Sequence, residues 1–105
     1  GRVPEAARRA SDLLENAKAL EPLDRGRTFV LVGDVFRANG DDDRALEQYE
    51  RAVDALEESG GLFLVEAGTR LSELLEELGR TDEALAVLRS AVAGAREHEP
   101  RGSRR

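Results

Sequence analysis

The chain has 105 residues, enough for one domain with a single hydrophobic core. It contains no cysteine and only one histidine, His98, which excludes disulfides, thiolate metal sites and multi-histidine metal sites. At 36% charged and 40% hydrophobic residues, the composition is typical of a soluble, mostly helical protein. No apolar run is long enough to span a membrane, and the N-terminus lacks the apolar core of a signal peptide. We therefore expect a cytoplasmic protein without a membrane partner.

The charge balance is acidic, with 16 basic and 22 acidic residues and a net charge of −6. Residues 26–60 carry four arginines against nine acids, residues 61–97 carry four against seven, and only residues 98–105 are net positive. Proteins that bind nucleic acid usually present a basic stripe to the phosphates. The acidic middle of this chain would repel phosphate, so we expect no direct contact with nucleic acid.

Apolar residues recur every three or four positions between regularly placed glycines and prolines, which is the spacing of amphipathic helices. Taking Pro22, Gly26, Gly40, Gly60–Gly61 and Gly79 as breakers, we predict five helices. Their expected ranges are 4–21, 27–39, 42–58, 62–78 and 82–97. Asp41–Asp43 and Thr81–Asp82 each follow a glycine and are interpreted as caps that place acids at the start of a helix. We expect residues 98–105 to form a flexible basic tail.

One spacing of small and large residues occurs three times in the chain. The three copies are Ala10–Leu14–Ala17, Ala45–Tyr49–Ala52 and Ala84–Leu88–Ala91. The second and third copies are 39 residues apart, as are the two glycines that precede them, Gly40 and Gly79. Alanines at this spacing let two antiparallel helices approach closely while the large residue fills the gap between them. The pattern therefore predicts repeated helix hairpins.

The motif Phe29-x2-Val32-Gly33-x2-Phe36, followed by Gly40 and then Ala45, Tyr49 and Ala52, resembles the tetratricopeptide repeat (TPR). A weaker copy follows, with Gly68, Leu71, Ser72 and Leu75 before Gly79, Ala84, Leu88 and Ala91. The resemblance implies an all-α fold, a right-handed superhelical stack of antiparallel hairpins, in one domain over residues 1–97. Residues 4–21 would be an unpaired second helix, 27–58 the first repeat and 62–97 the second. Because the spacing of 39 exceeds the family's usual 34, we expect one extra helical turn at about residues 62–65.

Residues that could carry chemistry have simpler explanations. Asp41–Asp43 lack the alternating acids, central glycine and terminal glutamate of a calcium loop, so we interpret them as helix caps. Glu76 and Glu77 are neighbours on a helix and point in different directions, which does not suit paired acid–base work. His98 stands near the chain's end without an evident partner. We therefore expect no enzyme activity, no metal and no cofactor.

In the TPR family, the first helix of each repeat lines a concave groove that holds a peptide or a helix. The resemblance places the groove positions at Arg27, Val30, Asp34, Arg37 and Ala38 in the first repeat, and at Glu66, Thr69, Glu73, Glu76 and Glu77 in the second. The Lys and Asn that form a carboxylate clamp in chaperone-binding members are absent at these positions. Four acids on one helix face favour a basic partner, although these positions could equally be ordinary solvated helix faces.

The ends of the predicted stack predict self-association. Leu85, Val92 and Ala95 lie on the side of the last helix where a following repeat would dock, and the first helix lacks a hairpin partner. Because exposed apolar patches usually mark interfaces, we expect a two-fold homodimer.

The predicted function is a protein–protein interaction module in a fragment of a longer bacterial protein. By analogy it would be the sensor or dimerisation part of a transcription regulator. The alternative is a purely structural oligomerisation domain whose groove is unused.

Overall fold

A computed structural model describes residues 2–17, 20–57 and 61–97 of the chain. These residues form five α-helices and no strand. The helices are α1 (Arg2–Ala17), α2 (Pro22–Ala38), α3 (Asp42–Leu56), α4 (Gly61–Glu77) and α5 (Thr81–Glu97). The tail expected at residues 98–105, with His98, lies outside the described residues. None of the described helices is long and apolar enough to cross a membrane.

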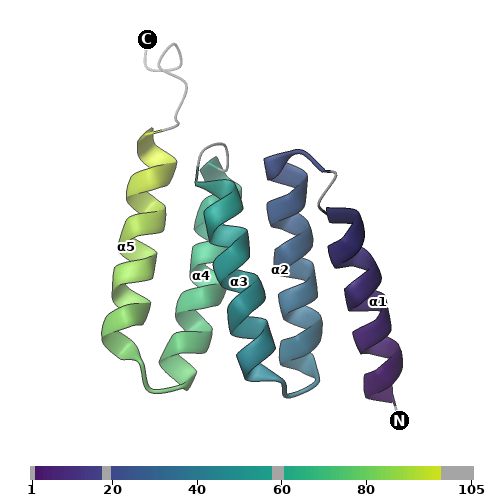
Figure 1. Ribbon diagram of the computed structural model, residues 1–105. Helices are drawn as coiled ribbons and strands as arrows, with labels where there is room; N and C mark the ends of the chain where they lie inside the picture. The colour runs from purple at the N-terminus through teal and green to yellow at the C-terminus, as the bar shows by residue number, and fades with distance from the viewer. Residues whose placement is uncertain (1, 18–19, 58–60, 98–105) are drawn as a thin grey trace.

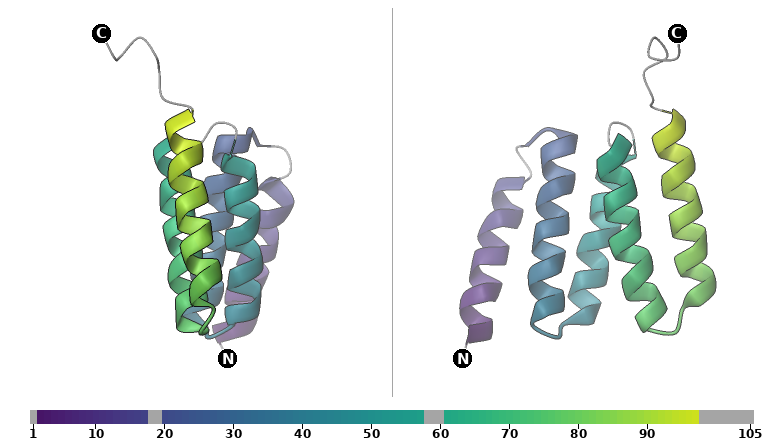
Figure 2. Two further views of the ribbon diagram at one scale, coloured as in Figure 1. Left: turned by 90° about the vertical axis from the view of Figure 1, so that its left-hand side faces the viewer. Right: turned by 180° about the vertical axis from the view of Figure 1, so that it is seen from behind.

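The helices stand side by side in chain order, each antiparallel to the one before it (Figure 1). The closest pairs are α2 with α3 and α4 with α5, and α2 also contacts both α1 and α4. Seen from behind, α2 and α4 lie nearer the viewer than α3 (Figure 2). The structure therefore confirms an all-α stack of antiparallel hairpins, with α1 as the helix that precedes the first hairpin.

The first hairpin begins earlier than the sequence pattern predicted. We expected the first helix to run to residue 21 and the next to begin at residue 27, but α1 ends at Ala17 and α2 begins at Pro22. Glu21 is extended, with φ −61° and ψ 154°, because a residue that precedes proline avoids the helical region. Pro22 itself suits the first helical position, where its missing N–H costs nothing. The proline starts a helix here, and the expected boundaries of the first two helices were wrong.

Gly26 is not a break in the chain but a contact point inside α2. It is buried, and a Cβ built on it would lie 2.4 Å from Cγ of Leu56 in α3. The second hairpin makes a similar close approach at Gly68, where a Cβ would lie 2.5 Å from Cβ of Ala91 in α5. Each hairpin thus uses the missing side chain of a helical glycine to bring its two helices together.

The turns inside the two hairpins have the same geometry. Gly40 and Gly79 take φ values of 80° and 81°, which glycine adopts without steric cost. In the first turn the Asp41 N–H donates to the Phe36 carbonyl at 2.9 Å, and in the second the Arg80 N–H donates to the Leu75 carbonyl at 2.8 Å. These are the bonds of a Schellman helix end. The internal repeat therefore includes the backbone of the turn.

One extra helical turn was expected at about residues 62–65, at the start of the second hairpin. Residues 62–65 lie in the first turns of α4, which has 17 residues, and α2 has 17 residues as well.

The start of α3 follows the predicted capping. The Asp41 carboxylate accepts a hydrogen bond from the Arg44 N–H at 3.2 Å, and Asp42 and Asp43 lie in the first turn. At α5, Thr81 is already the first helical residue and not a cap that precedes the helix. Acids in the first turn of both helices lie next to the positive end of the helix dipole.

The repeated small residues form the centre of the packing, as predicted. All six alanines of the three copies are buried, namely Ala10, Ala17, Ala45, Ala52, Ala84 and Ala91. Of the large residues between them, Tyr49 is fully buried, whereas Leu14 and Leu88 are only partly buried. Leu14 and Leu88 belong to α1 and α5, which are the first and last of the described helices in the row (Figure 1).

Candidate functional site

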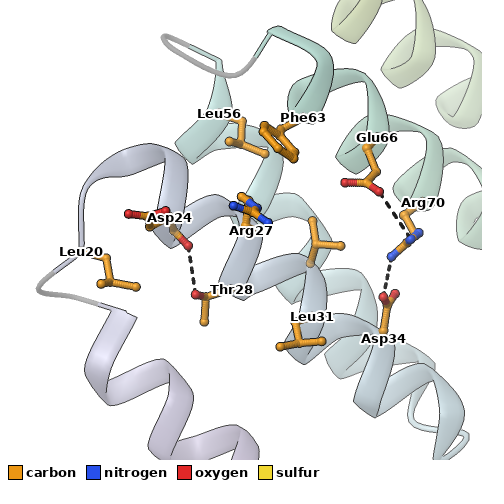
Figure 3. Close-up of a pocket in the computed structure, with 11 residues that line it drawn as sticks. Leu20, Asp24, Arg27, Thr28, Leu31, Asp34, Leu56, Phe63, Glu66 and Arg70 are labelled. Carbon is orange, nitrogen blue, oxygen red and sulfur yellow. Dashed lines mark hydrogen bonds and ion pairs between the residues drawn. The ribbon is translucent and has the colours of Figure 1, made fainter.

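A hollow of about 640 Å³ opens between α2 and α4 (Figure 3). Its apolar side is formed by Leu20, Val30, Leu31, Leu56 and Phe63, and its polar side by Asp24, Arg27, Thr28, Asp34, Glu66 and Arg70. Arg27, Val30, Asp34 and Glu66 are among the groove positions expected from the sequence. These four expected positions therefore line one hollow.

Two features of the hollow suit it to a side chain from another molecule. Leu31 is 54% exposed, although it is a large apolar residue in the middle of a helix that packs against three neighbours. The Arg27 guanidinium lies over the Phe63 ring, 4.7 Å from its centre, which is a cation–π geometry. The hollow thus offers apolar surface next to the planar, charged guanidinium group of Arg27.

The buried Tyr49 is hydrogen-bonded to Asp34, one of the residues that line the hollow. The Tyr49 hydroxyl donates to Oδ1 of Asp34 at 2.5 Å. Burial, followed by the hydrogen bond to Asp34, raises the pKa of Tyr49 to about 12. The ring fits under α2 because residue 33 is glycine, where a Cβ would lie 2.6 Å from Cε1 of Tyr49. Asp34 is therefore held from below by Tyr49.

Ion pairs between α2 and α4 run along the same face. Arg70 pairs with Asp34 across the two helices and with Glu66 at 3.7 Å within α4 (Figure 3). One turn further on, Arg37 pairs with Glu77 at 2.5 Å and with Glu73 at 3.9 Å. Partial burial lowers the pKa of Arg37, but hydrogen bonds to Glu77 and Tyr49 outweigh it and the pKa is raised. Several of the acids expected to await a basic ligand already face an arginine of this chain.

Val30 and some of the expected groove positions outside the hollow have different surroundings. Val30 is 7% exposed and belongs to the core as well as to the wall of the hollow. The Thr69 hydroxyl donates to the Val65 carbonyl within α4 at 2.8 Å. Ala38 and Glu76 are exposed, and Glu76 has no side-chain hydrogen bond or ion pair to any residue that the structure describes.

Sequence reasoning missed Leu31, Phe63 and Arg70. Leu31 and Arg70 are 39 residues apart and so occupy the same position in the two repeats, a position that the groove assignment passed over. The repeat register could have identified this pair. Nothing in the sequence indicated that the Arg27 guanidinium would stack on the Phe63 ring.

The residues expected at the self-association face lie on α5. Leu85 is 49% and Val92 38% exposed, and Ala95 is partly exposed.

Among the residues that the structure describes, no three acidic, histidine or cysteine side chains come together as a metal site would require.

The fold and the groove define a class of protein, a helical repeat scaffold whose first helices face a shared groove. A model of the tetratricopeptide repeat family matches residues 24–97. The chain therefore belongs to the tetratricopeptide repeat family, whose repeat is a non-catalytic scaffold for protein–protein interaction. The match begins inside α2 and ends with α5, so it spans both hairpins. Comparisons with curated proteins and with solved structures give no match.

Proposed function

We propose that the face shared by α2 and α4 binds a peptide segment of another protein, which inserts an apolar side chain into the hollow and lays basic residues along the acidic part of the groove. The observation that carries this proposal is the exposure of Leu31 on the wall of the hollow, next to the Arg27–Phe63 stack. Exposed apolar surface rimmed by polar groups is a common mark of a binding groove.

The charges on this face support a basic partner. The hollow is lined by three carboxylates and two guanidinium groups. Glu73, Glu76 and Glu77 follow on α4, with Arg37 opposite them. The face keeps an excess of acids after its internal ion pairs are formed, so a basic peptide is attracted and an acidic one is repelled.

The test measures binding of labelled peptides that combine one large apolar residue with two or three lysines or arginines, by fluorescence anisotropy. Leu31→Lys should abolish binding, because it puts a like charge into the hollow. Leu78→Lys is the matched control, since Leu78 is 40% exposed but does not line the hollow. Binding of basic peptides should weaken as salt shortens the Debye length from about 10 Å to about 3 Å. Preference for acidic peptides, or equal binding by both variants, would refute the proposal.

The second candidate is a structural oligomerisation domain with an unused groove, favoured by the exposed apolar residues Leu85 and Val92. It predicts a homodimer that Leu85→Glu converts to a monomer in light scattering across a concentration series. The wider context, a sensor or dimerisation part of a transcription regulator, is proposed by analogy with other helical repeat modules alone.

A further inference from the structure

Arginines on the groove side of α2 and α4 differ in what neutralises their charge. Arg70 and Arg37 each form two ion pairs with carboxylates. Arg27 forms no ion pair and no side-chain hydrogen bond with any residue in the described part of the chain. Its guanidinium instead lies over the Phe63 ring, 4.7 Å from the ring centre (Figure 3). Arg27 is therefore a cation in the wall of the hollow without a carboxylate partner.

This charge restricts what can fill the hollow. Arg27 is exposed and lies four residues before Leu31, so the two side chains are neighbours on one face of α2. A ligand side chain that covers Leu31 also removes water from the guanidinium. Taking a charge out of water costs free energy unless the ligand supplies an attractive group in exchange. An aliphatic side chain has no such group, so it suits the hollow poorly.

Two kinds of ligand group attract a cation, namely a carboxylate and the face of an aromatic ring. A ligand carboxylate would lie in the same hollow as Asp24 and Glu66. Asp24 has no ion pair with any described residue, so its charge would repel that carboxylate. An aromatic ring has a negative face but no net charge. A ring is therefore attracted by Arg27 without being repelled by the acids around it.

We propose that the hollow selects an aromatic anchor, with tryptophan the best, whose ring face packs on the exposed side of the Arg27 guanidinium and whose edge covers Leu31. The guanidinium would then lie between the Phe63 ring and the ring of the ligand. The hollow, at about 640 Å³, has room for such a ring. The inference rests on the proposed function and names the anchor residue that the proposed function leaves open.

The probes are labelled peptides that share the same lysines and differ only at the anchor, which is tryptophan, leucine or a tryptophan with one to four fluorines on its ring. By fluorescence anisotropy, the tryptophan peptide should bind about three- to thirtyfold more tightly than the leucine peptide. Fluorine withdraws electrons from the ring face and leaves the ring apolar. Affinity should therefore fall stepwise with the number of fluorines, whereas burial of apolar surface alone predicts no loss.

Two protein variants assign this effect to one arginine. In Arg27→Met, which removes the charge and keeps an unbranched side chain, the dependence on fluorine number should vanish. Arg89→Met is the matched control, since Arg89 is exposed, lies outside the hollow and gives the same change in net charge. The dependence should persist in this control. Both variants change exposed side chains, so thermal melts should stay close to that of the wild type.

The outcomes separate this inference from the proposed function. If the tryptophan and leucine peptides bind the wild type equally, or if affinity does not depend on fluorine number, the aromatic anchor is overturned while the groove still binds peptides. A dependence that persists in Arg27→Met would overturn the assignment to Arg27. If neither peptide binds, the proposed function fails and this inference fails with it. Should Arg27→Met unfold, the fluorine series on the wild-type protein decides by itself.

Discussion

A side chain added at Gly33 should destabilise the protein even though it favours the helix. A Cβ there would lie 2.6 and 2.7 Å from two carbons of the Tyr49 ring, about 1 Å inside the best van der Waals separation. The ring is fully buried and tied to Asp34 at 2.5 Å, so it has little room to move. Overpacking lowers the free energy of unfolding by about 1–3 kcal/mol. Replacing glycine by alanine in a helix raises it by about 1 kcal/mol.

For Gly33→Ala we therefore expect a net loss of up to about 2 kcal/mol from the free energy of unfolding. In a domain of this size that lowers the melting temperature by up to about 15 °C, as measured by circular dichroism. Gly94→Ala is the matched control, because its Cβ would meet only a terminal methyl of Leu64, at 3.0 Å. That flexible methyl can yield, so Gly94→Ala should raise the melting temperature. If both variants raise it equally, the Tyr49 ring does not lie under α2 as described.

The second hairpin supplies a rescue for the same clash. In the second hairpin, Ser72 stands at the place of Gly33 and Leu88 at the place of Tyr49. The glycine is thus replaced by a larger residue and the tyrosine by a smaller one. Gly33→Ser and Tyr49→Leu should each destabilise the protein, and the double variant should lose less than the sum by about 1 kcal/mol or more. Strict additivity in urea unfolding would refute the direct contact.

Three further predictions concern the first hairpin. Phe36→Ala should lower the free energy of unfolding by about 3–5 kcal/mol, because Phe36 is buried in the core; a melt that barely moves would contradict the hairpin packing. Gln48→Val should stabilise the protein by about 1 kcal/mol in urea unfolding, since Oε1 of Gln48 is buried without a partner in the described structure and α5 has Val87 at this place. Tyr49 is the only tyrosine, so phenolate absorbance should report its pKa of about 12. Because folding raises this pKa, the stabilisation is complete below the unfolded value of about 10 and is lost as pH rises through 12; ionisation near pH 10 in the folded protein would contradict this.

Helix content and hairpin pairing could be predicted from the sequence because both depend on local periodicity. The apolar spacing indicated all five helices, and the alanines at the closest approaches were identified from their repeat alone. An amphipathic helix must bury its apolar stripe, and small residues in that stripe determine where a second helix can come close. The order of the elements and their antiparallel packing followed from those two constraints.

Glycine and proline are ambiguous by themselves, and the tertiary structure decided their roles. Gly26 looked like a chain break because glycine disfavours helices, yet it lies inside α2, where Leu56 of α3 occupies the space of its missing side chain. Pro22 was interpreted as the end of one helix and is the start of the next. A glycine can form a turn or allow a close contact inside a helix, and only the position of the neighbouring helix decides between these two roles.

The electrostatics of the groove also depended on the tertiary structure. The sequence indicated acids on the face of α4, but it gave no sign that Arg37 of α2 would pair with two of them, Glu73 and Glu77. Nor did it indicate that Arg70 of α4 would pair with Asp34 of α2. Ion pairs between helices depend on how far one helix is shifted along the other and on which rotamer a long side chain adopts. Neither quantity is set by the periodicity within a single helix. The sequence therefore determined which helices form and which faces they bury, whereas the packing of α2 against α4 decided which charges remain available to a partner.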